Sequence, residues 1–245
     1  MKAQSQDVIE RLQNVRTRLA RACESAGRDP DDVTLLAVSK GHPSGHIKAA
    51  WEAGQRLFGE NYVQEWLQKA EDPLLVGLDG LQWHFIGALQ RNKIKFLLGR
   101  VHCIETLDRE RLAQELSRRC ADHLGRRPQQ VLVEVNLGNE PTKAGYQPNQ
   151  LEACFGDLLQ LDGLSITGLM AIPQPHDTPE ATRGDHRALR LLRDRLQDRH
   201  GSPLPTLSMG MSSDFEVAIS EGSTQVRVGT AIFGQRTPAP RRANV

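Results

Sequence analysis

The stretch VTLLAVSKGHPSG, residues 33–45, decides between the two α/β folds that the rest of the sequence allows. It opens with an apolar run typical of a buried parallel strand and ends in a polar, glycine-containing loop. An open doubly wound sheet usually follows its first strand with a phosphate loop of GxGxxG spacing, and VSKGHPSG lacks that spacing. The stretch therefore favours a closed barrel over an open sheet.

The sequence beyond this stretch repeats the alternation of strand and helix. Further short apolar or β-branched runs lie at 56–61, 82–87, 101–105, 131–136, 166–172, 207–211 and 226–233. Helical patterns lie between them at 44–53, 63–70, 93–99, 109–123, 150–161, 179–199 and 213–220. Strands that alternate with helices predict a parallel sheet, and eight such strands close a single (β/α)8 TIM barrel without a second domain.

An extra helix precedes the barrel. Apolar residues recur there at helical spacing, at Val8, Leu12, Val15 and Leu19, while Arg and Glu fill the opposite face. We expect one barrel domain over residues 1–235. The proline- and arginine-rich end, 236–245, is expected to be a flexible tail.

Composition restricts the partners and the cellular location. The hydrophobic fraction of 38%, the charged fraction of 25% and the net charge of +1 describe an ordinary soluble protein with no electrostatic attraction to nucleic acid or membranes. The start of the chain lacks the apolar core of a signal peptide, and no apolar run is long enough to span a bilayer. Four cysteines without a CxxC pair indicate reduced thiols. We expect a cytoplasmic protein.

The carboxyl ends of the strands form the functional face of such a barrel, and the first strand places Lys40 there. A lysine that leaves a hydrophobic strand is partly desolvated, which favours the neutral, nucleophilic amine that forms Schiff bases with aldehydes. A solvated lysine that opens a loop fits the same pattern. Lys40 alone does not decide between the two.

Two residues on the next strands are also ambiguous. Asn61 would lie beside Lys40, where it could donate a hydrogen bond to a ligand oxygen or cap the following helix. His84, in the third strand, could point into the barrel or outward, and a structural histidine is the simpler interpretation.

The last two strands favour a phosphate site. Ser212, Ser213 and Asp214 follow the seventh strand and are expected to begin a helix, while Gly229 and Thr230 follow the eighth. Backbone N–H groups and hydroxyls in these two loops bind phosphate in many barrels. Ordinary helix capping and turn formation would explain each loop separately.

Arg227 lies between two valines of the eighth strand. An arginine that points into the barrel needs an acceptor from the protein or from a ligand, because an unpaired buried charge is costly. The alternative is an arginine that faces the helices and pairs with an acidic residue.

Six segments together resemble the pyridoxal phosphate homeostasis protein family, which is related to the barrel domain of bacterial alanine racemases and eukaryotic ornithine decarboxylases. They are AVSK (37–40), FGENYVQE (58–65), WHFIGALQRNK (83–93), GLMAIP (168–173), MGMSSDFEVAI (209–219) and VRVGTAIFG (226–234). The resemblance extends from the N-terminal helix to Gly234 and implies a barrel that binds pyridoxal 5′-phosphate and no metal.

By this resemblance, Lys40 carries the cofactor as a Schiff base. Ser212 binds its phosphate, with Gly229 and Thr230 completing the phosphate cradle.

The resemblance also places Arg227 opposite the pyridine nitrogen and Asn61 near the 3-oxygen of the ring, with His84 and Met209 close to the cofactor. The pair Gly41-His42, after the lysine, departs from the family's usual small-polar pair. The loop 137–145 also varies within the family.

The resemblance and Arg227 together indicate a carrier. A charged arginine disfavours a proton on the ring nitrogen and so weakens the electron sink that amino-acid chemistry requires. Racemases of this fold also add a C-terminal β domain that supplies a tyrosine, whereas this sequence ends shortly after Gly234. We expect a monomeric, non-enzymatic protein that buffers intracellular pyridoxal phosphate or delivers it to apoenzymes.

Two alternatives remain open. One is an amino-acid racemase of the alanine racemase type that uses Lys40 with Tyr62 or His84 as proton carriers. The other is an aldolase-type barrel whose lysine works without a cofactor.

Overall fold

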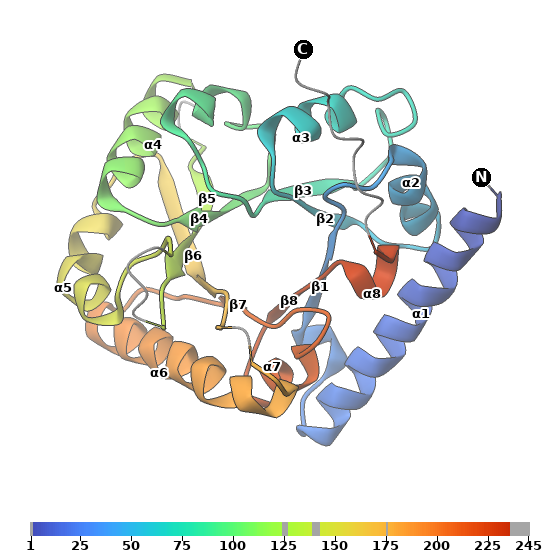
Figure 1. Cartoon of the computed structure of the whole chain (residues 1–245). Coiled ribbons are helices and arrows are strands. Elements are labelled where there is room, and N and C mark those ends of the chain that lie inside the picture. Colours follow the sequence, from blue (N-terminus) through green and yellow to red (C-terminus); the bar gives the residue numbers. More distant parts are fainter. Residues whose placement is uncertain (1, 124–126, 139–142, 175, 236–245) are drawn as a thin grey trace, which may run out of the picture.

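The computed structural model describes residues 2–123, 127–138, 143–174 and 176–235, and it forms a closed barrel of parallel strands in sequence order (Figure 1). The strands are β1 (Thr34–Val38), β2 (Leu57–Glu60), β3 (Gln82–Phe85), β4 (Cys103–Leu107), β5 (Gln129–Val135), β6 (Leu164–Ala171), β7 (Thr206–Ser208) and β8 (Gln225–Val228). The predicted TIM barrel is confirmed.

Helices surround the barrel and cover its outer surface (Figure 1). The α-helices are α1 (Lys2–Ser25), α2 (Ser44–Glu52), α3 (Val63–Ala70), α4 (Glu110–His123), α5 (Pro148–Leu159), α6 (Arg183–His200), α7 (Phe215–Ser220) and α8 (Thr230–Phe233). The described residues also form the 3₁₀ turns η1 (Pro30–Asp32), η2 (Arg91–Phe96) and η3 (Pro179–Thr182). The predicted helix at 93–99 is thus a shorter 3₁₀ turn.

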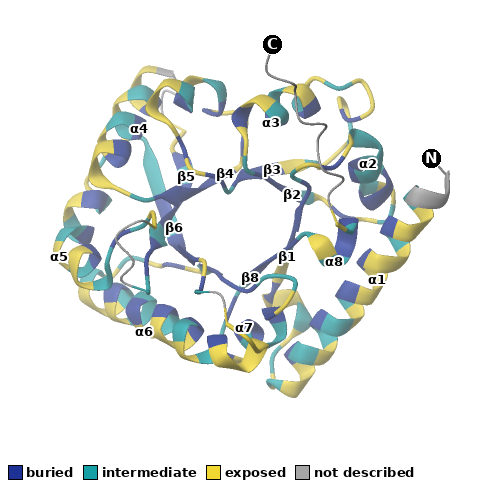
Figure 2. Ribbon diagram, in the orientation of Figure 1, coloured by how far each residue is buried: buried dark blue, intermediate teal, exposed yellow. Residues whose placement is uncertain are grey.

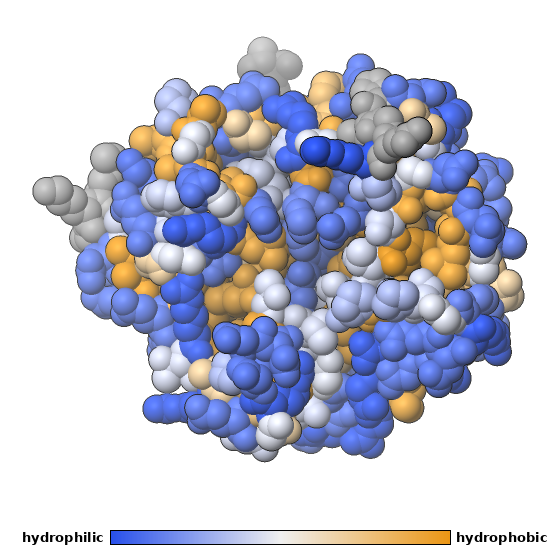
Figure 3. Space-filling view, turned by 180° about the vertical axis from the view of Figure 1, so that it is seen from behind, coloured by the Kyte–Doolittle hydropathy of each residue, from blue (hydrophilic) through white to orange (hydrophobic). Residues whose placement is uncertain are grey.

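The strands are buried on both faces, and the exposed residues follow the outer sides of the helices (Figure 2). The run of Leu36, Ala37 and Val38 in β1 shows why, since none of the three is more than 7% exposed. Such uninterrupted apolar runs are typical of parallel strands that are covered by helices. Seen from behind, the outer rim is correspondingly hydrophilic, with apolar atoms between the charged ones (Figure 3).

The extra N-terminal helix packs along the outside of the barrel against α2, α7 and α8 (Figure 1). Its apolar stripe, Val8, Leu12, Val15 and Leu19, is buried as the sequence predicts. Beyond its end, the guanidinium of Arg28 donates to the carbonyl oxygens of Ile219 and Ser223, at 3.0 and 2.6 Å. The chain just after the helix is therefore fixed to α7 and to the turn that follows α7.

Several predicted boundaries near the C-terminus are wrong, including that of the seventh strand, which ends at Ser208 rather than 211. The eighth strand ends at Val228 rather than 233, because the N–H groups of Ile232 and Phe233 bond to the carbonyl of Gly229 as in a helix. A short apolar run does not distinguish a strand from a buried helical turn by its pattern alone. Similarly, α7 begins at Phe215 instead of 213, because the preceding residues form a turn.

Other predictions stand as follows. The four cysteines are free, and Cys23, Cys103 and Cys120 are buried. No helix within the described ranges is long and apolar enough to cross a membrane. The extent of the domain, 1–235, stays a prediction, and the expected tail at 236–245 lies outside the described residues.

Gly168 provides a test of the packing between β6 and β7. An added Cβ would lie 1.8 Å from the carbonyl oxygen of Thr206, its partner in β7. We predict that Gly168→Ala lowers the free energy of unfolding of the apoprotein by about 3 kcal/mol, measured by urea denaturation. Gly184→Ala is the matched control, because no atom lies within 4 Å of its added Cβ. Equal midpoints for the two variants would contradict the close approach of the two strands.

Candidate functional site

A cavity of about 340 Å³ opens at the carboxyl ends of the strands. Its lining brings together all six residues that the sequence singled out as cofactor contacts: Lys40, Asn61, Ser212, Arg227, Gly229 and Thr230. The remaining lining residues are Val38, His42, Ile86, Met170, Ile172, Met211 and Ser213. The predicted residues therefore share one cavity, although their individual roles toward a cofactor stay predictions.

Lys40 enters this cavity from the end of β1. The ladder between β1 and β2 continues to Ser39, whose N–H donates to the carbonyl of Gly59 at 3.0 Å. The chain then turns at Gly41, whose φ of 75° is in the left-handed region that glycine adopts without strain. Lys40 and Gly41 are thus the central residues of a tight turn, which is closed by the bond from the N–H of His42 to the carbonyl of Ser39. Lys40 lines the cavity at the functional end of the barrel.

The loops after β7 and β8 meet at the hydroxyl of Ser212. Its Oγ accepts hydrogen bonds from the N–H groups of Gly229 and Ala231, at 3.2 and 3.3 Å. Gly229 lies close to β1, since an added Cβ would be 3.2 Å from the carbonyl oxygen of Val38. Hydroxyl and backbone N–H donors converge here, as a phosphate group requires.

Asp214 fixes the loop that carries Ser212. Its Oδ1 accepts from the N–H of Met211 at 2.7 Å, and its Oδ2 lies 3.0 Å from Nε2 of His186, which is also buried. Burial raises the pKa of Asp214, but the bonds from His186 and Met211 outweigh that effect and lower the pKa overall. The sequence predicted Asp214 in the first turn of the helix. It lies instead in the turn just before α7, which its side chain stabilises.

Arg227 points into the barrel, which settles the choice left open by the sequence. Its guanidinium donates to the carbonyl oxygens of Ser208 and Ala171, at 2.7 and 2.8 Å, and to Oγ of Ser208 at 2.7 Å. Burial lowers the pKa of Arg227. The nearby carboxylates of Glu105, Glu134 and Asp214 oppose that shift. The guanidinium is therefore held rigidly at the cavity by neutral oxygens.

A buried polar cluster beneath Arg227 explains the position of the His84 side chain. Nδ1 of His84 lies 2.6 Å from Oε1 of Glu105, and Oε2 of Glu105 accepts from the hydroxyl of Ser208 at 2.7 Å. His84 is thus structural, and it does not line the cavity. Met209 belongs to the hydrophobic core and does not line it either, so the expectation that both lie close to the cofactor is not supported.

Asn61 does not cap α3, whose N-cap residue is Tyr62. Its side-chain Oδ1 is buried and has no hydrogen-bond partner within the described part of the chain. The backbone of Asn61 lies close to Gly87, just after β3, because an added Cβ at Gly87 would be 2.0 Å from the carbonyl oxygen of Asn61. An unpartnered amide oxygen in a polar cavity is costly, and a ligand would relieve that cost.

His42 is a polar lining residue that sequence reasoning missed as a contact. It is 8% exposed, and its ring packs against Phe233 of α8 with centroids 5.3 Å apart. The sequence signal for it was the unusual Gly41-His42 pair that directly follows the lysine. This packing joins the loop after β1 to the helix after β8.

The donor set of the cavity fits pyridoxal phosphate. Lys40 offers an amine for the aldehyde, Ser212 and the amides near it suit the phosphate, and Arg227 supplies a fixed charge. Val38, Ile86 and other apolar residues could contact the flat ring.

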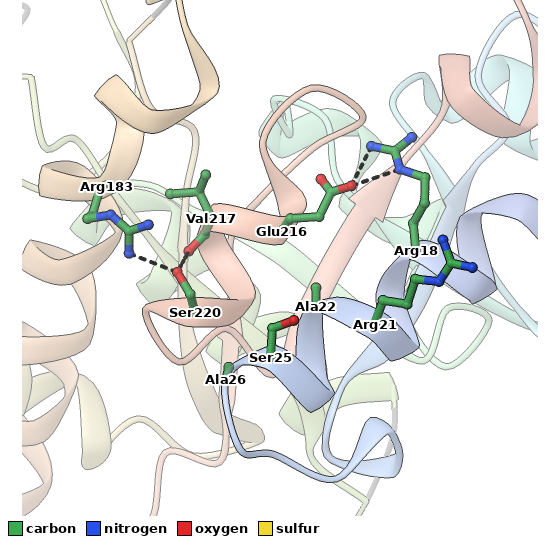
Figure 4. A pocket seen from close by; sticks show the side chains of 9 residues that line it. All are labelled: Arg18, Arg21, Ala22, Ser25, Ala26, Arg183, Glu216, Val217 and Ser220. Carbon is green, nitrogen blue, oxygen red and sulfur yellow. Dashed lines mark hydrogen bonds and ion pairs between the residues drawn. The ribbon is translucent and has the colours of Figure 1, made fainter.

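A second cavity, of about 430 Å³, lies outside the barrel among α1, α7 and the start of α6 (Figure 4). Arg18 pairs there with Glu216 at 2.6 Å, and Arg183 donates to Oγ of Ser220 at 2.9 Å. These charged groups thus have partners within the protein. No group of side chains suited to a metal ion occurs among the residues that the structure describes.

The sequence and the fold both match known proteins. Residues 11–237 match the family model of the alanine racemase N-terminal domain. A pyridoxal phosphate homeostasis protein of Aquifex aeolicus is 48% identical over 230 residues, which cover 94% of this chain and 99% of that protein.

Solved structures agree with this match. PipY of Synechococcus elongatus, solved with pyridoxal phosphate bound, is 37% identical, with a TM-score of 0.81 over 93% of this chain and 100% of that one. Alanine racemase of Corynebacterium glutamicum is 17% identical, with a TM-score of 0.64 over 95% of this chain and 63% of that one, and so shares the fold. This chain belongs to the pyridoxal phosphate homeostasis protein family, built on the barrel of the alanine racemase N-terminal domain.

Proposed function

We propose that this protein binds pyridoxal 5′-phosphate on Lys40 and takes part in intracellular homeostasis of the cofactor by storing or delivering it. The observation that carries the proposal is the shared cavity, which holds Lys40, the unpartnered oxygen of Asn61 and the converging donors around Ser212. The binding of the same cofactor by PipY, at 37% identity, supports it.

Each side chain has a distinct task in the proposal. The neutral amine of Lys40 attacks the aldehyde of the cofactor and forms a C=N bond, with the oxygen leaving as water. Ser212, Gly229 and Thr230 hold the phosphate, and Asn61 accepts or donates a hydrogen bond at the ring. Hydrolysis of the same bond returns the aldehyde, so binding through Lys40 is reversible.

Arg227 favours storage over chemistry. Pyridoxal phosphate supplies an electron sink when its ring nitrogen is protonated. A guanidinium fixed at the cavity by Ser208 and Ala171 disfavours that proton. Arg227 therefore holds the pyridine ring in place and also weakens the ability of the ring to withdraw electrons.

The two proton carriers that the racemase alternative would use besides Lys40 are not positioned at the cavity. Neither Tyr62 nor His84 lines the cavity; Tyr62 is 60% exposed, and His84 is bonded to Glu105. Both observations support a carrier without turnover. We propose that it acts as a monomer and that apoenzymes dependent on pyridoxal phosphate receive the cofactor.

The covalent bond is tested with Lys40→Ala. We predict that the purified protein, mixed with pyridoxal phosphate, shows the absorbance band of an imine and that Lys40→Ala lacks it, because the variant has no amine at the cavity. Lys48→Ala, which removes a partly exposed lysine of α2, is the matched control and should keep the band. A band of full intensity in Lys40→Ala would contradict the proposal. A wild-type protein without the band would favour a lysine that works without the cofactor.

The phosphate cradle is tested with Ser212→Ala. We predict about tenfold weaker retention of pyridoxal phosphate, because the variant loses a hydroxyl at the meeting point of two loops. Affinity is measured by equilibrium dialysis, and the stability of the apoprotein by thermal unfolding. Ser213→Ala, the next residue in the loop, serves for comparison. Loss of apoprotein stability without loss of retention would leave Ser212 as a capping residue only.

The absence of turnover is tested by hydrogen exchange at Cα of amino acids. Holoprotein is incubated with single enantiomers of small amino acids in deuterium oxide, with free pyridoxal phosphate as the control. We predict deuterium incorporation no faster than in the control, because the site presents a weakened sink and neither Tyr62 nor His84 lines the cavity. Incorporation at turnover rates would contradict the carrier and establish a racemase.

A further inference from the structure

The two peptide groups on either side of the Lys40 α-carbon are both held by side chains of α3. The carbonyl oxygen of Ser39, directly before Lys40, accepts a hydrogen bond from Nζ of Lys69 at 2.8 Å. The N–H of Gly41, directly after it, donates to Oε1 of Glu65 at 2.5 Å. Glu65 and Lys69, here called the α3 clamp, also pair with each other at 2.6 Å.

Lys69 is the buried member of the clamp, and its ammonium group is fully engaged. Lys69 is 5% exposed, and its ammonium group donates to Ser39, Glu60 and Glu65, which uses all three of its protons. Glu60 also accepts from the hydroxyl of Ser39 at 2.6 Å. The ion network thus surrounds the residue that precedes Lys40.

Stability alone is a poor reason for this network. Burying charged groups costs about as much as their attraction returns, so a buried ion pair often contributes little net stability. Oε2 of Glu60 is buried without a partner in the described part of the chain, and burial raises the pKa of Glu60 despite the neighbouring Lys69. Such costly groups are often retained where they fix the geometry of a site.

The α3 clamp fixes the part of the backbone that sets the direction of the Lys40 side chain. The peptide groups before and after a residue fix its φ and ψ, and these angles fix the direction of its Cα–Cβ bond. The turn at Gly41, with φ of 75°, and the bond from the N–H of His42 to the carbonyl of Ser39 complete this frame. An amine at the end of a long, flexible side chain benefits from such a fixed origin.

We propose that Glu65 and Lys69 are positioning residues that hold the backbone of Lys40 so that its amine meets the aldehyde of pyridoxal phosphate. This inference rests on the proposed function. In the step concerned, the amine nitrogen forms the C=N bond and the aldehyde oxygen leaves as water. The clamp favours that step and leaves the phosphate cradle, which is built on the loops after β7 and β8, unchanged.

The test compares two ligands that differ at the reacting carbon. Pyridoxal phosphate can form the imine, whereas pyridoxine 5′-phosphate carries an alcohol there and binds without a covalent bond. We expect Glu65→Ala to weaken the apparent affinity for pyridoxal phosphate about tenfold, because a charge-assisted hydrogen bond to Gly41 is lost. The affinity for pyridoxine 5′-phosphate should stay unchanged within about twofold.

Two further variants control the comparison. Glu65→Gln keeps an oxygen that can accept from Gly41 and should weaken pyridoxal phosphate binding only about threefold. Glu115→Ala removes a carboxylate that pairs with Arg119 at the same i,i+4 spacing on α4, and its 20% exposure matches the 24% of Glu65. It should change neither affinity.

The outcomes separate the two proposals. Unchanged binding of pyridoxal phosphate by Glu65→Ala, or equal loss of both ligands, would overturn the positioning role. If the alanine variant does not fold, the same comparison with Glu65→Gln decides it, with a loss confined to pyridoxal phosphate in support. A wild-type protein that forms no imine would instead overturn the proposed function and this inference with it.

Discussion

The pairing of β1 with β8 is the constraint on which the rest of the structure depends. Leu36 lies beside Arg227 and Ala37 beside Val228, so the first and last strands of the sheet become neighbours. In an open sheet these strands would lie far apart, and so would Lys40 and the loop that begins at Gly229. Closure of the barrel therefore builds the cavity, because it places the lysine beside the loops that suit a phosphate.

Buried polar side chains refine the geometry that closure provides. Within the barrel, Glu105 engages the hydroxyl of Ser208, whose oxygens hold Arg227 at the cavity. Between the barrel and α3, Lys69 bonds to the residue before Lys40. The backbone beside Lys40 and the guanidinium of Arg227 are thus held by separate networks, a division that suits a site built to hold one ligand in one orientation.

The sequence predicted the barrel and six of the residues that line the cavity, because strand patterns and the family resemblance both bear on the carboxyl ends of strands. It was less reliable where a short apolar run fits either a strand or a buried helical turn, as at Ile232 and Phe233, which are helical. It also placed His84 near the cofactor, whereas Glu105 holds that ring below the cavity. The bond between Lys69 and Ser39 depends on the packing of α3, and residue spacing alone carries no signal for it.

Membership of the pyridoxal phosphate homeostasis family, together with a cavity that holds a lysine, a fixed arginine and a phosphate-type loop, yields a consistent account of reversible cofactor storage. Its most direct test is the site of covalent attachment. Holoprotein is reduced with borohydride, which makes the C=N bond permanent, and is then digested and mapped by mass spectrometry. The account predicts a single pyridoxyl adduct, on Lys40. An adduct on another lysine in place of Lys40, or no adduct, would contradict it.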